Sequence, residues 1–132
     1  METVIEINEI VEGMPIVEAA IDKIRHDLNI REEVFGNVLI AVTEAVNNAY
    51  YHGNKGDNNK TVKISFIKPG QYRLAVVVCD QGEGFDPDNL EDPTEPENIE
   101  KEGGRGVFLM RNLCDKLSFS EGGKVVELNF NI

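Results

Sequence analysis

The stretch of sequence that decides the fold spans residues 37–52 and reads NVLIAVTEAVNNAYYH. Most of it is apolar and compatible with a helix, but its second half also carries polar side chains. Glu44, Asn48 and His52 are spaced four residues apart, so a helix would line them along one stripe. A carboxylate and amides in an otherwise buried helix cost several kcal/mol in aggregate unless something pairs with them. This unmet demand predicts a ligand site on the helix.

The sequence on either side of this helix predicts the other elements. Apolar residues recurring every three or four positions indicate helices, and alternating ones indicate strands. One helix is expected to open at Gly13-Met14-Pro15 and end at Asn29, a second to run from residue 31 to 52, and a third to cover 107–114. Strands are expected over residues 2–8, 61–67, 71–79, 117–120 and 124–132, with turns at Pro69-Gly70 and at 121–123.

The order of these elements, βααββ-loop-αββ, predicts the fold class. It favours an α+β two-layer sandwich, with a mostly antiparallel mixed sheet and helices on one face. A length of 132 residues fits a single domain over residues 1–132. The two cysteines lack a CxxC spacing and are expected to be reduced core thiols. No apolar run approaches the ~18 residues of a membrane span, and no basic segment opens the chain, so we expect a cytoplasmic protein without a membrane partner.

The charge of the chain excludes one class of partner. The net charge is −11, whereas proteins that bind nucleic acid directly or bind anionic membranes need a basic face. The acids concentrate in residues 80–102, which hold ten of them against one base, Lys101. Such a run is usually a solvated loop. Because a poorly periodic segment of this length is unusual in a small domain, a lid or binding loop is the alternative.

Three features of the sequence share a chemical explanation. They are the Glu44–Asn48 turn, the DQGEG turn at residues 80–84 and the GGRG segment at 103–106. Taken singly, each could be a loop glycine or an exposed polar residue. Together they suit a nucleotide. Glycines at a helix start let backbone N–H groups approach phosphate, an Asn carbonyl oxygen is a suitable ligand for magnesium, and an Asp at a strand end can accept a hydrogen bond from an exocyclic amine.

The same segments resemble a known family. TEAVNNAYYHG, DQGEGF and GGRGVFLM are similar to the N box and the two glycine boxes of the ATPase fold shared by DNA gyrase, the heat-shock chaperone ATPase, histidine kinases and the MutL mismatch-repair protein. The resemblance spans about residues 38–130. It is tighter to the small bacterial anti-sigma factor serine/threonine-protein kinases of the RsbW and SpoIIAB type, through EAVNNAYYHG, CDQGEGFDP and GRGVFLMRNLCDKL.

The resemblance implies ATP and Mg²⁺ as cofactors and a role for each motif residue. Asn48 would bind magnesium, and Glu44 would be the general base for a substrate serine. Asp80 would hold the adenine amino group, with Gly82 and Gly84 shaping the turn beneath the base. Gly104, Arg105 and Gly106 would contact the phosphates, and residues 86–103 would form the ATP lid.

The resemblance also implies partners. The substrate would be an anti-anti-sigma protein, the second partner a sigma factor held inactive, and the kinase a homodimer. One position departs from the pattern, because Lys124 stands where related ATPases usually have a Thr near the adenine-binding Asp. Two other functions stay open: a regulator that uses nucleotide to set its affinity for a partner without phosphotransfer, and a purely structural α+β domain.

Overall fold

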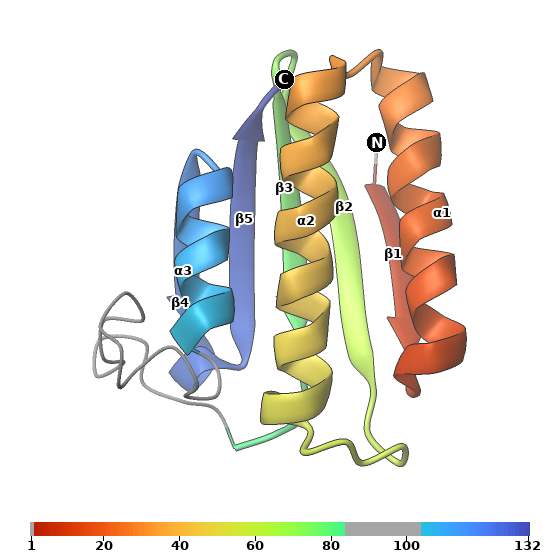
Figure 1. Ribbon diagram of the computed structural model, residues 1–132, viewed down its shortest axis with the longest axis vertical. Helices are drawn as coiled ribbons and strands as arrows, with labels where there is room; N and C mark the ends of the chain where they lie inside the picture. The colour runs from red at the N-terminus through yellow and green to blue at the C-terminus, as the bar shows by residue number, and fades with distance from the viewer. Residues whose placement is uncertain (1, 84–103) are drawn as a thin grey trace.

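The computed structural model describes residues 2–83 and 104–132, which form two layers: a five-stranded sheet and helices on one of its faces (Figure 1). The sheet has the order β1-β2-β3-β5-β4, and all its neighbouring strands are antiparallel. The strands are β1 (Glu2–Ile7), β2 (Val62–Gly70), β3 (Arg73–Cys79), β4 (Lys116–Ser120) and β5 (Val125–Asn131). The α-helices are α1 (Ile10–Leu28), α2 (Glu32–Asn48) and α3 (Gly104–Leu113). The predicted α+β class and order of elements are confirmed, and the sheet of the described strands is purely antiparallel instead of mixed.

Helix α2 lies over the middle of the sheet, with α1 and α3 on either side of it (Figure 1). Its inward side chains, such as Val42 and Val46, are fully buried. So are the inward residues of the strands beneath, among them Phe66, Val76 and Leu128. Burying an apolar side chain of this size stabilises the fold by roughly 1.5–3 kcal/mol. The polar stripe of α2 is therefore carried on an element that the core holds in place.

Helix α1 begins earlier than predicted. The carboxylate of Glu9 accepts hydrogen bonds from the N–H groups of Val11 at 2.7 Å and Glu12 at 2.8 Å, and so caps a helix that starts at Ile10. The expectation that the helix opens at Gly13-Met14-Pro15 is wrong, because this cap lies upstream and Pro15 is accommodated inside the helix. The predicted end is confirmed, since Asn29 caps the helix with a left-handed φ of 52°.

Helix α2 does not continue regularly to His52. The α-helix ends at Asn48, and Ala49–Gly53 form a π-helical turn in which the N–H of Asn54 donates to the carbonyl of Ala49 at 2.8 Å. A π turn bonds each residue to the fifth one before it, instead of the fourth. Glu44 and Asn48 lie on the same stripe of the α-helix, and His52 lies in the π-helical turn that follows it.

Two other boundaries differ from the predictions. The β2–β3 turn lies at Gln71-Tyr72 and not at Pro69-Gly70, because β2 continues to Gly70 past an irregularity in its pairing with β3. Helix α3 begins at Gly104, so Gly104, Arg105 and Gly106 form its first turn instead of preceding it. The last hairpin turns at Glu121–Gly123, as predicted, with left-handed φ values at all three residues.

Two further findings concern the cysteines and the length of the helices. Both cysteines, Cys79 and Cys114, are free and half-buried. None of the helices within residues 2–83 and 104–132 is long and apolar enough to cross a membrane.

Candidate functional site

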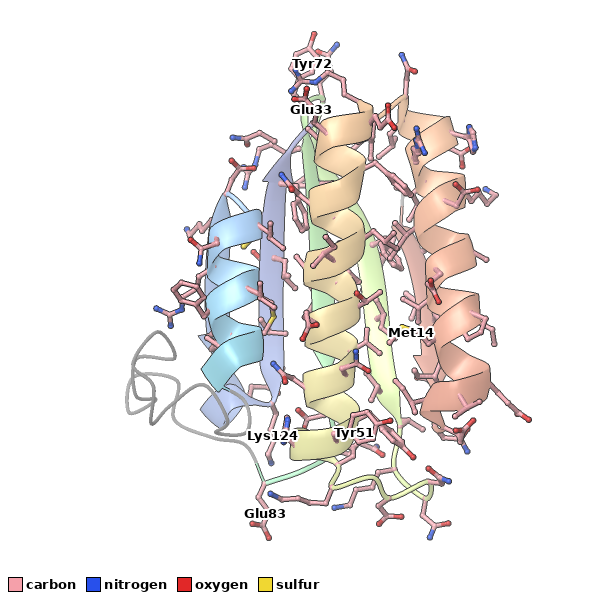
Figure 2. The ribbon with its side chains drawn as sticks, viewed as in Figure 1. Met14, Glu33, Tyr51, Tyr72, Glu83 and Lys124 are labelled. Atoms are coloured by element: carbon pink, nitrogen blue, oxygen red, sulfur yellow. The ribbon has the colours of Figure 1, made fainter. Side chains whose placement is uncertain are left out.

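Four segments that are distant in sequence meet at one end of the molecule. They are the end of α2 with its π-helical turn, the end of β3, the start of α3 and the β4–β5 turn (Figure 1). Figure 2 shows Lys124, Tyr51 and Glu83 at this end, and Glu33 and Tyr72 at the opposite end. The segments that carry the three sequence motifs therefore lie together.

Asn48 on α2 lies directly against Gly106 on α3. A Cβ atom added to Gly106 would lie 2.6 Å from Nδ2 of Asn48, closer than real Cβ atoms approach, and 3.0 Å from its Oδ1. Gly106 is itself buried. Glycine at this position is thus what lets the first turn of α3 approach the Asn48 amide. The geometry joins two of the predicted motifs.

The polar side chains of α2 differ in whether they form hydrogen bonds within the protein. Thr43 Oγ1 donates to the carbonyls of Leu39 at 2.8 Å and Ile40 at 3.0 Å, so its demand is met within the helix. Glu44 and Asn48 are half-buried, and neither side chain has a hydrogen-bond partner among residues 2–83 and 106–132, whose side chains the structure describes. The same holds for Asn47, which lies about 100° away around the helix. Glu44 and Asn48 are separated by one helical turn and lie on the same stripe.

The Asp80 carboxylate is fixed by the backbone around it. The N–H of Gly82 donates to Asp80 Oδ1 at 2.8 Å, and the N–H of Asp80 donates to the carbonyl of Lys124 at 2.9 Å. A Cβ atom on Gly53 would overlap the Asp80 carboxylate, and one on Gly82 would overlap the carbonyl of Gly53. Two glycines thus allow the π-helical turn and the turn after β3 to close around this side chain.

The charge on Asp80 is set by opposing effects. Burial is the largest and raises the pKa of the carboxyl group above its ordinary value. The hydrogen bond from Gly82 and the ammonium groups of Lys124 and Lys60 lower that pKa in part. A half-buried carboxyl group in such a place can accept a hydrogen bond from a ligand amine.

Lys124 lies beside Asp80, at the position where the sequence departs from the family pattern. The β3–β5 register pairs Cys79 with Val125, and the hydrogen bond from Asp80 to the Lys124 carbonyl continues this ladder by one residue. Lys124 brings a cation close to the carboxylate. The correspondence between Lys124 and the usual Thr of related ATPases stays a prediction.

Asn54 is a residue of this site that sequence reasoning missed. It is fully buried, and its side chain bonds both the start of β2 and the turn after β3. In the sequence it lies in the polar cluster GNKGDNN, where Asn58 and Asn59 have the same composition around them. No local signal distinguishes the buried asparagine from the exposed ones.

Some of the predicted site falls beyond the part that can be described. Gly84 and the expected lid, residues 86–103, lie outside the described residues. For Gly104 and Arg105 the structure defines the backbone, which forms the first turn of α3. The first N–H groups of a helix have no partner within it and favour an anion.

The residues present fit a nucleotide with its metal ion. Within the described chain, no group of three or more His, Cys, Asp or Glu side chains is placed to hold a metal ion by itself. Magnesium bound through phosphates keeps waters and needs few protein ligands. The Asn48 carbonyl oxygen is an oxygen donor at the start of α3, where phosphate groups are favoured.

Comparison with known proteins agrees with this geometry. Residues 12–130 match the histidine kinase-like ATPase domain family. The serine-protein kinase RsbW of Staphylococcus aureus strains JH9 and Newman is 32% identical over 96 residues, which cover 67% of this chain. The matched segment spans 60% of the length of these relatives.

Proposed function

The chain belongs to the histidine kinase-like ATPase domain family, and from this we propose that it is an ATP-dependent protein serine kinase and anti-sigma factor. The observation that carries the proposal is the contact between Asn48 and Gly106, which sets a half-buried amide against the first turn of α3. In this proposal residues 1–132 form one nucleotide-binding domain, and residues 86–103 serve as its lid.

Each site residue has a proposed task in binding. Asp80 accepts a hydrogen bond from the adenine amino group, while Gly82 and Gly84 let the chain turn beneath the base. The N–H groups of Gly104, Arg105 and Gly106 bind the phosphates. Asn48 supplies an oxygen ligand to Mg²⁺. The half-burial of Asp80 and Asn48 supports these assignments, because a bound ligand would satisfy both side chains.

Glu44 is the proposed catalytic base. Magnesium ATP supplies an activated phosphoryl group with its charge partly neutralised. The Glu44 carboxylate would take the proton of the substrate serine hydroxyl. The serine oxygen would then bond to the γ-phosphorus of ATP as the bond between that phosphorus and the leaving oxygen of ADP breaks. One helical turn separates Glu44 from Asn48, so the group that moves the proton is fixed relative to the group that holds the metal.

The proposed partners follow from the relatives, which are serine-protein kinases. The substrate is an anti-anti-sigma protein, the second partner is a sigma factor, and the kinase acts as a homodimer. The net charge of −11 favours protein partners over direct contact with nucleic acid.

Replacing the base tests the proposal. The partner is captured from the source cell on the immobilised protein with ADP present and is then incubated with radiolabelled Mg-ATP. We expect Glu44→Gln to bind ATP with unchanged affinity and to lose phosphotransfer by about 100-fold or more, as expected for a general base. Glu33→Gln, at the exposed start of the same helix, is the matched control and should transfer normally.

Two outcomes would change the assignment. Equal phosphotransfer by wild type and Glu44→Gln would remove Glu44 from the role of base. ATP binding without phosphotransfer by the wild type would favour the alternative, a regulator that uses nucleotide only to set its affinity for a partner.

A further inference from the structure

Asn54 occupies an unusual position for a turn residue. It follows the π-helical turn, its main-chain N–H donates to the Ala49 carbonyl at 2.8 Å, and its side chain is 0% exposed. Its neighbours in the same polar segment, Lys55 and Asn58, are exposed. A buried primary amide is costly unless its hydrogen bonds are made.

Both ends of the Asn54 amide are bonded to backbone. Nδ2 donates to the carbonyl of Thr61, just before β2, at 2.9 Å. Oδ1 accepts from the N–H of Gln81, just after β3, at 2.8 Å. Gln81 closes the triangle, because its Oε1 accepts from the N–H of Thr61 at 2.7 Å. One side chain thus connects the turn after α2 with the chain just before β2 and the chain just after β3.

This network leads directly to Asp80. The Gln81 N–H that Asn54 holds belongs to the peptide bond between Asp80 and Gln81. On one side of Asn54, Gly53 lies against the Asp80 carboxylate, and beyond Gln81 the N–H of Gly82 donates to Asp80 Oδ1. Movement of the Gln81 peptide would therefore carry the carboxylate with it.

We infer that Asn54 is a positioning residue for base recognition, which acts through the Gln81 peptide to hold the Asp80 carboxylate where it meets the exocyclic amine of a purine. The inference rests on the proposed function. Its physical basis is that a charge-assisted hydrogen bond depends on distance and angle, and that a mobile carboxylate would accept it less well. The role differs from fold stabilisation, since it concerns one atom pair between protein and ligand.

The test compares two nucleotides that differ only in the amino group that Asp80 is proposed to bind. ATP carries the 6-amino group, and purine riboside triphosphate lacks it but has the same ring, sugar and phosphates. The wild type should bind Mg-ATP about 10- to 100-fold more tightly than the analogue, which is the range for a hydrogen bond to a charged group. In Asn54→Ser we expect this ratio to fall by about tenfold, with affinity for the analogue little changed.

Asn129→Ser is the matched control. Asn129 is also a buried asparagine, 5% exposed, and its amide bonds Glu127 and Arg73. It pairs with Ala75, near the other end of β3 from Asp80. This variant should have a lower Tm and keep the wild-type ratio. A ratio that stays unchanged in Asn54→Ser, or falls equally in both variants, would overturn the inference.

A second measurement uses the wild-type protein, so it does not depend on whether a variant folds. Hydrogen exchange of the free wild type should show the Gln81 amide as strongly protected as the amides of β3, because its partner is fully buried. Rapid exchange at Gln81 would overturn the inference. Failure of the wild type to bind either nucleotide would instead contradict the proposed function, and this inference with it.

Discussion

Asp80 is a residue whose proposed role in binding a ligand would come at the expense of the stability of the fold. Its carboxyl group is half-buried, and burial raises its pKa. Because the folded-state pKa lies above the unfolded one, ionised Asp80 opposes folding at neutral pH. That penalty disappears as the pH falls below the unfolded pKa, where the group is neutral in both states. A charge kept in this position is typical of a binding site.

We therefore predict that Asp80→Asn is more stable than the wild type at pH 7. The gain should be at most about 1 kcal/mol, since solvent screens half of the group, or a rise in Tm of at most about 4 °C. The difference should shrink as the pH falls through the pKa of Asp80, while affinity for ATP falls about tenfold. Thermal unfolding between pH 4 and 7, with titration by ATP, measures both.

Glu18→Gln, an exposed replacement on α1, serves as the control and should leave both quantities unchanged. Destabilisation of Asp80→Asn at pH 7 would show that the carboxylate contributes to folding. The account of its raised pKa would then be wrong.

At the scale of elements, the packing of α3 on α2 assembles the site. The first turn of α3 reaches the Asn48 amide because Gly106 has no side chain. We predict that Gly106→Ala weakens Mg-ATP binding by about tenfold or more, since the added Cβ displaces either Asn48 or the start of α3 and overpacking costs roughly 1–3 kcal/mol. Titration calorimetry measures the loss.

Gly36→Ala is the matched control for this prediction. Gly36 also lies in a helix, α2, and a Cβ atom there would meet nothing within 4 Å. It should leave ATP affinity unchanged and raise stability by roughly 0.5–1 kcal/mol, because alanine replaces glycine in a helix interior. Wild-type affinity in Gly106→Ala would contradict the proposed contact between the two helices.

The elements also show what local sequence can and cannot predict. Apolar periodicity predicted the helices, the strands and their order, because burial on one face imposes it. It did not predict the π-helical turn after Asn48. In that turn the Ala49 carbonyl accepts a hydrogen bond from Asn54, which is buried by tertiary packing. The start of α1 was missed because its cap is a glutamate, Glu9, instead of the residues that usually mark helix starts.

The same distinction applies to the candidate site. Asn48, Asp80 and Gly106 were predictable because a polar or glycine residue interrupts an apolar pattern, and the structure brings them to one end of the molecule. Asn54 was not predictable, because its burial depends on β2 and β3, which lie next to it only in the fold. The roles proposed for all the site residues in binding and catalysis remain predictions.

At the scale of the whole molecule, the two layers place stability and binding in different regions. The core lies between α2 and the central strands, and the candidate site lies at the end where four segments meet (Figure 1). The net charge of −11 disfavours a bound nucleotide at long range. At physiological salt such repulsion is largely screened beyond about 8 Å. Near Asp80, Lys60 and Lys124 provide the opposite charge.

The central claim is that magnesium ATP binds at Asn48, and calorimetric titration of the wild type and Asn48→Ala tests it most directly. Asn37→Ala, an exposed change on the same helix, is the control. We predict saturable binding of Mg-ATP at one site in the wild type and in the control, weakened when EDTA removes the metal. In Asn48→Ala the affinity for Mg-ATP should fall at least about tenfold and should no longer depend on magnesium, because the oxygen ligand that the protein supplies to the metal is absent. Absence of binding in the wild type, or wild-type affinity and magnesium dependence in Asn48→Ala, would contradict the claim.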